Sequence, residues 1–412
     1  MRILWFTNTP SCYKTQKGGY NGGGWISSLE KEIKKISNVD LAICFHSPNK
    51  DSFKIEEDNV IYYPISPNRK IINKLYKKIG IHKKNDQYQV DKYLDVINDF
   101  KPDVINIFGS ENSFGLISLK IKNIPIVLHI QGILTPYLTA YYPPKFSFYG
   151  VLFDSLNPLK ILKAYRTIKD WHYNVKREQL MLSNIPYFMG RTEWDRRITN
   201  IYSPQAKYFI CNEILRDIFY EETNVHIVNQ KFNITTTISS PYYKGFDTIL
   251  QAAYILKNNL EMDFIWNVFG ISDVSNYERK FKIKATDCNI KIGGIVDAQT
   301  LVKQLKESTV FVHPSYIDNS PNSVCEAQML GCPVIATNVG GISSLIKDSV
   351  SGFLIPANDP YQMAYLIRKI YMEKDMARKI SINARKQAQE RHNKNAIISD
   401  LMTIYNKICN ND

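Results

Sequence analysis

Residues 312–356 read VHPSYIDNSPNSVCEAQMLGCPVIATNVGGISSLIKDSVSGFLIP, and this stretch decides the fold. The β-branched and aromatic run at 309–312 is typical of a buried parallel strand. A polar loop follows, and then a helix that we expect to be capped by Asn322 or Ser323 and to end at Gly331. A second apolar run directly after that glycine predicts another strand. The stretch is therefore a βαβ unit.

Two polar segments of this unit lie where parallel strands end. They are the loop at 315–322 and the glycine pair Gly340–Gly341. Ligands of open α/β sheets bind at the carboxyl ends of the strands, and a helix N-terminus there offers unpaired N–H groups and partial positive charge. Asp318 in the loop and Glu326 on the helix would repel a phosphate but accept hydrogen bonds from sugar hydroxyls. The pattern therefore predicts a site for a phosphate and a sugar.

The same stretch resembles the donor-site signature of family 4 glycosyltransferases, which are retaining enzymes of the GT-B fold. The matching residues are Pro314-Ser315, Asp318, Glu326-Ala327, Gly331-Cys332-Pro333-Val334, Gly340-Gly341 and Ser351-Gly352-Phe353-Leu354. The family usually has Glu at the first acid, and Asp318 is one methylene shorter. This difference is compatible with a shifted or water-mediated contact, a different donor sugar or weaker activity.

The resemblance implies an α/β chain with two facing Rossmann-like domains and a donor site in the cleft between them. The length of 412 residues and a hydrophobic content of 44% suit two domains. We expect an acceptor domain at 1–210 and a nucleotide-sugar donor domain at 211–391, with the crossover where patterning fades at 204–229. A C-terminal helix at about 392–412 should pack back on the first domain.

Lys244 is the residue expected to grip the donor diphosphate, because Lys244-Gly245 matches a Lys-Gly pair of the family. The family also carries an Arg just after the preceding strand. That position falls near Ser239 or Ser240 here, so the Arg is missing. A lysine holds a phosphate as a point charge, and Arg191 or Arg216 is a candidate to replace the lost partner.

Further donor contacts follow from the resemblance at other positions. The glycine-rich segment before a helix at 25–36 matches the family's glycine pair, and Gly23 and Gly24 abut that helix. His129 ends an apolar strand where the family often has a His near the donor sugar, although a structural His is an equal interpretation. The remaining expected donor-binding residues are Gly294, Ile295, Asn319, Ser320, Pro321, Asn322 and Ser323.

The resemblance also implies a mechanism. Glu326 should hold ribose hydroxyls, Asp318 a sugar hydroxyl, and Lys244 the charge that develops on the departing diphosphate. With His129 these are the expected catalytic residues. The phosphate itself would act as base, the anomeric configuration would be retained, and we expect no cofactor and no metal, since no DxD motif is placed to bind one.

The net charge of +13 and a pI near 9.1 suit anionic lipid, nucleotide-sugars or nucleic acid. No nucleic-acid-binding motif accompanies the charge, so we expect no nucleic-acid partner. The segment at 69–84 has a basic amphipathic helical pattern, which indicates either an anionic membrane surface or packing on its own domain. The aromatic segment at 137–149 is either an acceptor lip or a packed loop.

Seven scattered cysteines, the absence of a signal-peptide pattern and the absence of a long apolar run predict a cytoplasmic protein, with peripheral contact to the inner face of the membrane. The expected activity is transfer of a hexosyl or N-acetylhexosaminyl group from a nucleotide-diphosphate sugar to a glycan or lipid-linked acceptor in surface polysaccharide biosynthesis. Asp318 and the missing Arg keep an alternative open, a catalytically degraded nucleotide-sugar-binding protein.

Overall fold

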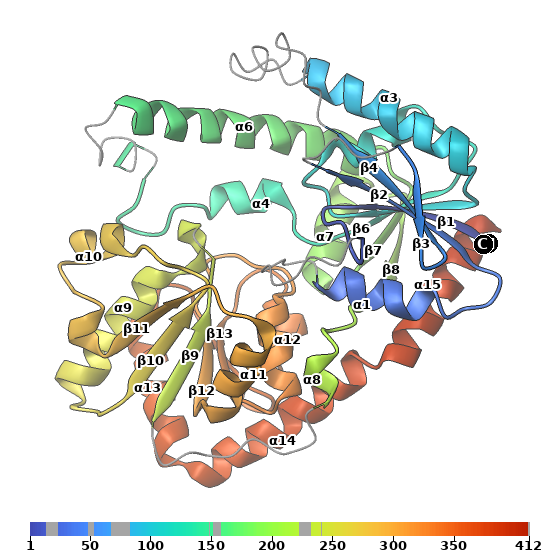
Figure 1. Ribbon diagram of the computed structural model, residues 1–412. Coiled ribbons are helices and arrows are strands. Elements are labelled where there is room, and N and C mark those ends of the chain that lie inside the picture. The colour runs from blue at the N-terminus through green and yellow to red at the C-terminus, as the bar shows by residue number, and fades with distance from the viewer. Residues whose placement is uncertain are drawn as a thin grey trace.

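The computed structural model describes residues 1–13, 24–47, 53–66, 83–147, 149–150, 158–221, 232–239 and 241–410. Two halves, each built around its own sheet, lie side by side (Figure 1). The predicted pair of Rossmann-like domains is thereby confirmed. Gly23, Ser240 and residues 69–82 of the basic segment lie outside the described residues.

The first half contains an eight-stranded sheet with the order β3-β4-β2-β1-β5-β6-β7-β8. Its strands are β1 (Arg2–Thr7), β2 (Asp40–His46), β3 (Ile55–Glu57), β4 (Val60–Ile65), β5 (Val104–Phe108), β6 (Ile126–His129), β7 (Tyr187–Gly190) and β8 (Lys207–Ile210). All neighbouring strands are parallel except β3 and β4, which pair antiparallel.

Strand β8 corrects one sequence-based interpretation. It pairs with β7 inside the stretch 204–229, which we expected to be only a crossover. It is a four-residue edge strand with half-exposed or exposed side chains, and so short a strand leaves little hydrophobic alternation in the sequence.

Helices cover both faces of this sheet. They are α1 (Gly24–Ile33), α3 (Lys83–Phe100), the 3₁₀ helix η1 (Ser113–Leu119), α4 (Leu134–Thr139), α6 (Pro158–Leu182) and α7 (Glu193–Tyr202). Successive side chains of β1 point to opposite faces, so Ile3 and Trp5 pack with α1 while Leu4 and Phe6 pack with α3 and η1. Both faces are therefore buried, as expected for a parallel sheet.

The second half contains a six-stranded parallel sheet with the order β11-β10-β9-β12-β13-β14. Its strands are β9 (Asn233–Thr237), β10 (Ile265–Phe269), β11 (Ile290–Gly294), β12 (Val310–His313), β13 (Val334–Thr337) and β14 (Phe353–Ile355). Its helices are η2 (Tyr242–Lys244), α9 (Phe246–Tyr254), η3 (Ile255–Asn259), α10 (Ser275–Phe281), η4 (Thr286–Cys288), α11 (Ala298–Glu307), α12 (Asn322–Met329), η5 (Ile342–Ser344), α13 (Pro360–Met372) and α14 (Lys374–Arg391).

Each sheet has one point where the strand order reverses. In the first sheet the order β4-β2-β1-β5-β6-β7 reverses between β1 and β5, and in the second the reversal lies between β9 and β12. Both sheets thus follow the Rossmann order, in which the crevice at the reversal, outside the carboxyl ends of the strands, is the usual place for a ligand. We call these two places the first and the second switch point.

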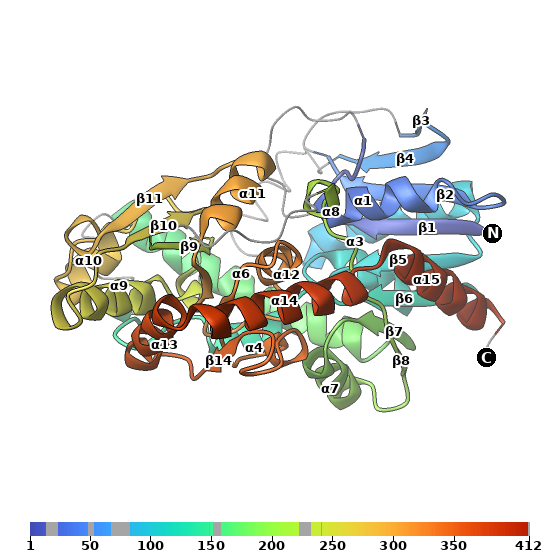
Figure 2. The same ribbon diagram turned by 90° about the horizontal axis from the view of Figure 1, so that it is seen from below.

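The chain crosses between the halves twice. It leaves the first sheet after β8 through 211–217 and α8 (Ile218–Glu221), and it returns through α14 and α15 (Lys394–Cys409). Figure 2 shows α14 and α15 following one another along the underside of both halves. The hydroxyl of Tyr405 on α15 accepts hydrogen bonds from Trp5 Nε1 at 3.1 Å and Asn106 Nδ2 at 2.7 Å, which fixes this helix on the first sheet.

A further contact between the halves comes from the segment after α4. Phe146, which is 6% exposed, belongs to the hydrophobic core of the second half. Its ring centroid lies 4.8 Å from that of Tyr242 and 5.2 Å from that of Tyr277. This part of the aromatic segment at 137–149 is therefore a packed strap across the two halves. Among the described helices, none has the length and the apolar character needed to cross a bilayer.

Candidate functional site

A cavity of about 290 Å³ lies between the two halves. The first half lines it with Gly24, Trp25, Gln131 and Arg191, and the crossover segment adds Arg216. The second half contributes the segments that follow β9, β10, β11 and β12, together with the start of α12. The cavity therefore lies at the second switch point and faces the first sheet.

The structure brings most of the predicted site residues together in this cavity. Its lining includes Lys244, Asp318, Glu326, Gly24, Ile295, Ser320, Pro321, Asn322 and Ser323. Three predicted residues do not line it, namely His129, Asn319 and Gly294. Gly294 ends β11 with a φ of 62°, and the next residue, Ile295, reaches the cavity instead.

Asp318 is the centre of a charged hydrogen-bond network. Its Oδ2 accepts from Lys244 Nζ at 2.7 Å and lies 3.0 Å from His313 Nε2. Its Oδ1 accepts from the hydroxyl of Tyr137, on α4 of the first half, at 3.4 Å. Burial by itself raises the pKa of this carboxyl, but Lys244 and His313 outweigh it and hold the pKa well below its usual range. Asp318 is therefore ionised, and it presents Lys244 to the cavity.

The position of Lys244 depends on the glycine that follows it. Gly245 has a φ of 79°, and a Cβ there would lie 2.1 Å from the backbone oxygen of Pro314. Only glycine allows this close approach of two backbones and this left-handed conformation. The Lys-Gly pair in the sequence is thus a geometric requirement of the loop that carries the cation.

Glu326, on α12, forms a bidentate ion pair with Arg216. Arg216 Nε and Nη2 donate to its two carboxylate oxygens at 2.8 and 2.9 Å. Burial raises the pKa of the Glu326 carboxyl, and the guanidinium opposes that rise. This arrangement places a buried carboxylate and a more exposed guanidinium, both lining the cavity, beside the start of the helix.

The start of α12 corrects the expected cap. The N-cap residue is Pro321, and no side chain caps the helix, because the segment from Ser320 to Ser323 lines the cavity. The first N–H groups of the helix are therefore left for another acceptor. The glycine pair packs under the preceding loop, since a Cβ at Gly340 would lie 1.8 Å from the backbone oxygen of Asp318.

Asn319 ties the loop before α12 to the first half. Its Nδ2 donates to the backbone oxygen of Gln131 and to Asp195 Oδ2, each at 3.1 Å, while its Oδ1 accepts from Thr192 Oγ1 at 2.6 Å. Its side chain is completely buried. This residue therefore sets the relation of the loop to the first half without lining the cavity.

His129 lies behind the cavity wall. The ring is 1% exposed, and its centroid lies 5.7 Å from that of Trp25, whose side chain reaches the cavity, and 5.3 Å from that of Phe108. Burial, with a smaller contribution from Arg191, lowers the pKa of His129 to about 3, so the ring is neutral. The ring of His129 packs against Trp25, which lines the cavity.

Serine occupies the position of the family's arginine, and Ser239 lines the cavity there. Both arginines considered as replacements also line it. Arg191 lies over the ring of Trp25, with its Cζ 5.6 Å from the ring centroid, and its Nη1 is 3.3 Å from Glu213 Oε2. Arg216 is the more exposed of the two, with 29% of its side chain accessible. It is therefore the better placed to contact a ligand.

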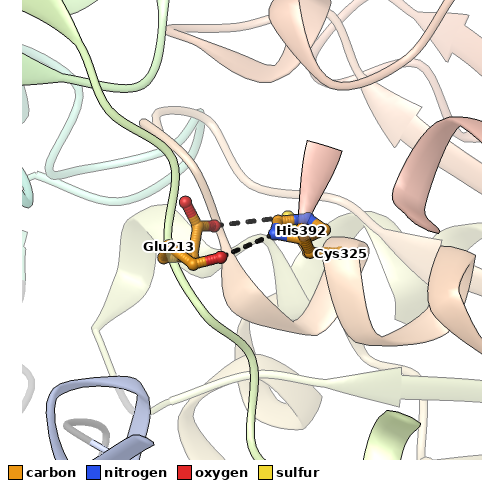
Figure 3. A group of neighbouring side chains, drawn as sticks. All are labelled: Glu213, Cys325 and His392. Carbon is orange, nitrogen blue, oxygen red and sulfur yellow. Dashed lines mark hydrogen bonds between the residues drawn. The ribbon is translucent and has the colours of Figure 1, made fainter. Parts of the chain in front are cut away.

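Glu213, Cys325 on α12 and His392 form a buried cluster, shown in Figure 3. Their potential ligand atoms all lie within 4.8 Å of one another, so they are the group in the described part of the chain that could hold a metal ion. Ser320 Oγ and Cys325 Sγ, however, both donate to Glu213 Oε1, at 3.2 and 3.6 Å. Arg191, mainly, lowers the pKa of Glu213 to about 2 against the effect of burial. This carboxylate is thus ionised and its charge is balanced by Arg191, so we interpret the cluster as a structural network.

Sequence reasoning missed two contributors to the site. Tyr137 contacts Asp318, and α4, which carries it, is held by Glu178. Glu178 accepts from the backbone N–H groups of Leu134 and Thr135, each at 2.9 Å. The only signal in the sequence was an acid inside a long basic helix, which does not show which helix start it caps.

With this geometry in place, the chain was compared with known proteins. Residues 222–387 match the family model described as glycosyl transferases group 1. A segment of 113 residues is 36% identical to the UDP-Gal:alpha-D-GlcNAc-diphosphoundecaprenol alpha-1,3-galactosyltransferase of Escherichia coli, covering 26% of this chain and 28% of that protein. The amylovoran biosynthesis glycosyltransferase AmsK of Erwinia amylovora is 20% identical over 297 residues, which cover 66% of this chain and 71% of AmsK.

The fold has matches over the whole chain. Sucrose-phosphate synthase from Thermosynechococcus elongatus superimposes with a TM-score of 0.72 and 15% identity, covering 100% of both chains. At this identity the match concerns the fold. Residues 222–387 are thus similar to the group 1 glycosyltransferases, and the two facing Rossmann-like domains of the chain have the GT-B fold.

Proposed function

We propose that the protein is a retaining glycosyltransferase that moves a sugar from a nucleotide-diphosphate sugar to a hydroxyl of a glycan or lipid-linked acceptor. The observation that carries this proposal is the Lys244–Asp318 pair beside an uncapped helix start in the inter-domain cavity. A cation and free N–H groups suit a diphosphate. Two carboxylates in the same cavity suit sugar and ribose hydroxyls.

In the proposed reaction, the bond from the acceptor oxygen to the anomeric carbon forms as the bond from that carbon to the phosphate oxygen breaks. The acceptor proton passes to the departing diphosphate. Lys244 and the first N–H groups of α12 stabilise the negative charge that grows there. Glu326 holds the ribose, Asp318 holds a sugar hydroxyl, and Arg216 takes the place of the family's missing Arg. The scheme has no metal ion and no cofactor.

The comparisons support the substrate classes in this proposal. One relative is named for a UDP-galactose donor and a diphosphoundecaprenol acceptor, and another for amylovoran biosynthesis. We accordingly place the reaction in surface polysaccharide biosynthesis, with a hexosyl or N-acetylhexosaminyl group as the sugar transferred.

A lipid-linked acceptor requires access to a membrane surface, and α6 offers one. Seven exposed residues of this helix recur at intervals of three or four and form one stripe, defined by Leu162, Tyr165, Arg166, Lys169, His172, Lys176 and Leu180. Leu162, Tyr165 and Leu180 are 42, 54 and 47% exposed, and no acidic residue belongs to the stripe. Apolar groups flanked by cations suit an anionic bilayer, so we propose peripheral binding at the inner face of the membrane through α6.

The membrane proposal is tested by sedimentation with vesicles of phosphatidylglycerol and of phosphatidylcholine. We expect binding to the anionic vesicles, and loss of that binding in the double variant Arg166→Glu, Lys169→Glu. The matched control is Lys291→Glu, since Lys291 is exposed on β11 of the other half. Equal binding to both lipids, or unchanged binding by the double variant, would contradict the proposal.

The donor proposal is tested by thermal shift with UDP-, GDP- and ADP-sugars on wild type, Glu326→Ala and the control Glu390→Ala, whose carboxylate is exposed on α14. A bound donor stabilises the fold by about 2.7 kcal/mol at a hundredfold excess over its dissociation constant. We expect a shift with one nucleotide class in wild type and control, and none in Glu326→Ala. Full sugar transfer by Glu326→Ala would contradict the assigned site.

The alternative of a degraded nucleotide-sugar-binding protein has one observation in its favour, the serine at the position of the family's arginine. It predicts a thermal shift with a donor but neither transfer nor hydrolysis of that donor. Release of nucleoside diphosphate from the donor that gives the shift would exclude this alternative.

A further inference from the structure

The donor cavity occupies the second switch point, whereas the first switch point carries residues that the proposed reaction does not yet use. Asn8 directly follows β1, and Gly109 to Glu111 directly follow β5, the two strands between which the first sheet reverses. Asn8 is exposed and Glu111 is partly exposed. A carboxylate and an amide thus stand at the place where Rossmann sheets bind ligands.

The side chains at this place are held in a fixed arrangement. Asn8 Nδ2 donates to Glu111 Oε2 at 3.1 Å, and Asn112 Nδ2 donates to Asn8 Oδ1 at 2.6 Å. Gly109 has a φ of 86°, and a Cβ there would lie 2.1 Å from Glu111 Oε2. The absence of a side chain at 109 therefore gives the carboxylate its place in the crevice.

The charge of Glu111 is not neutralised by an ion pair. Across the described ranges, no cation lies within ion-pair distance of its carboxylate. Arg177 approaches, but its Nη2 donates to the backbone oxygen of Glu111 at 2.5 Å and its Nη1 lies 3.3 Å from Asp86. Burial, and then the neighbouring carboxylate of Glu178, raise the pKa of Glu111 to about 7, while Asn8 and Arg191 oppose the rise.

The carboxylate follows a strand that neighbours one leading to the donor cavity. Strand β5 is the neighbour of β6, and Gln131, just beyond the end of β6, lines the cavity. Adjacent strands are about 4.8 Å apart. Glu111 also acts electrostatically on Tyr137, which contacts Asp318, and on Tyr243, which precedes Lys244. A hydroxyl bound at Glu111 would therefore belong to a molecule that reaches the sugar end of the donor site.

We propose that Glu111 and Asn8 form the subsite for the acceptor, in which the Glu111 carboxylate accepts a hydrogen bond from a hydroxyl of the acceptor sugar. This inference rests on the proposed glycosyl transfer. An unpaired carboxylate beside an amide is the pattern that binds adjacent sugar hydroxyls, because one accepts and the other both donates and accepts. Among the described residues no cation pairs with the Glu111 carboxylate, and this favours a neutral sugar over a phosphate as the occupant.

The test uses saturation-transfer NMR with octyl α-glycosides of glucose, galactose and N-acetylglucosamine as probes, in the presence of UDP. We expect a signal from wild type for at least one glycoside, and loss of this signal in Glu111→Gln and Asn8→Ala. The control Glu57→Gln, an exposed carboxylate on β3, should keep it. No signal from wild type, or an undiminished signal from Glu111→Gln, would overturn the subsite.

Transfer kinetics give the second readout. Loss of a hydrogen bond to a charged group should lower kcat/KM for the glycoside roughly ten- to a hundredfold in Glu111→Gln, with donor KM unchanged and partial rescue by Glu111→Asp. Because the ionised carboxylate is the acceptor of the bond, kcat/KM for the glycoside should fall below about pH 7 in wild type but not in Glu111→Gln.

The two proposals fail in different ways. If no nucleotide-sugar shifts the melting temperature of wild type, the donor proposal fails, whereas glycoside binding that depends on Glu111 still supports the subsite. If the donor binds and is turned over equally well by wild type and Glu111→Gln, the donor site stands and the acceptor subsite is wrong.

Discussion

The two switch points share a topology and differ in charge. At the second, Lys244, Arg216 and an uncapped helix start surround two carboxylates. At the first, Glu111 and Asn8 follow the two strands at the reversal, and Arg177 contacts Asp86 and the backbone oxygen of Glu111 rather than its carboxylate. The same strand order thus carries two different sets of side chains, which we propose to serve a diphosphate at one crevice and sugar hydroxyls at the other. The difference lies in a few loop residues.

The largest effect should come from the cation of the second switch point. Lys244→Ala should lower kcat about 10²- to 10³-fold, because the growing charge on the diphosphate loses its main partner. Initial rates at saturating donor measure this loss. Lys291→Ala is the control. A Lys244→Ala variant with a wild-type rate would contradict the proposal that the second crevice binds the diphosphate through this cation.

The glycines of the two crevices should differ in their response to alanine. At Gly245 the new Cβ meets the backbone of Pro314, which has no room to move, so Gly245→Ala should cost more than about 3 kcal/mol of unfolding free energy. At Gly109 the Cβ meets the side chains of Glu111 and Asn8. Gly109→Ala should therefore impair glycoside binding more than stability.

Chemical denaturation of both glycine variants, with donor and glycoside binding measured in parallel, checks this pair of expectations. If Gly109→Ala loses donor binding before glycoside binding, the assignment of the first crevice to the acceptor is wrong.

Asp318 should make the second crevice sensitive to acid. Its folded-state pKa is depressed, so its stabilising contribution is present above its unfolded pKa of about 3.9 and is lost as pH falls through the folded value. Asp318→Asn leaves Lys244 without its partner and should cost about 3 kcal/mol at pH 7. Unfolding curves from pH 7 to pH 2 should show this cost shrinking only below about pH 4, and a cost that does not depend on pH would argue against the ion pair.

Glu111 should change the stability of the fold with pH in the opposite direction to Asp318, and by a smaller amount. Its folded-state pKa is raised to about 7. Its ionisation therefore destabilises the fold as pH rises from its unfolded pKa of about 4.3 through 7. Glu111→Gln should melt at a higher temperature than wild type at pH 8, with a smaller difference at pH 5. Calorimetry at the two pH values measures this, and a lower melting temperature at pH 8 would contradict the unpaired state of the carboxylate.

The sequence predicted the second crevice far better than the first. Asp318, Glu326 and Lys244 lie in one βαβ unit and one strand–loop segment, where a local pattern fixes which side chains reach the same sheet edge. Glu111 meets Asn8 only because strand order brings two distant strands together. A single sequence carries no local signal for that pairing.

The errors in the prediction have physical causes as well. Asn322 and Ser323 are good capping residues, yet the turn before α12 directs this segment to the cavity. His129 matched a pattern in position, and its buried ring, which does not line the cavity, agrees with the structural interpretation that the sequence had left open. Propensity names the residue type that suits a position, and tertiary packing decides which direction the side chain takes.

The strap that ends in Phe146 resists separation of the two halves at a place away from the linkers. Two covalent crossings on one side form a hinge, and Phe146 acts as a latch away from them, seated against Tyr242 and Tyr277. Swinging the halves apart would withdraw this ring into water at a cost of roughly 1.5–3 kcal/mol. If the product of the proposed reaction leaves by such a motion, this aromatic contact would resist the motion together with the hydrogen bonds of Asn319.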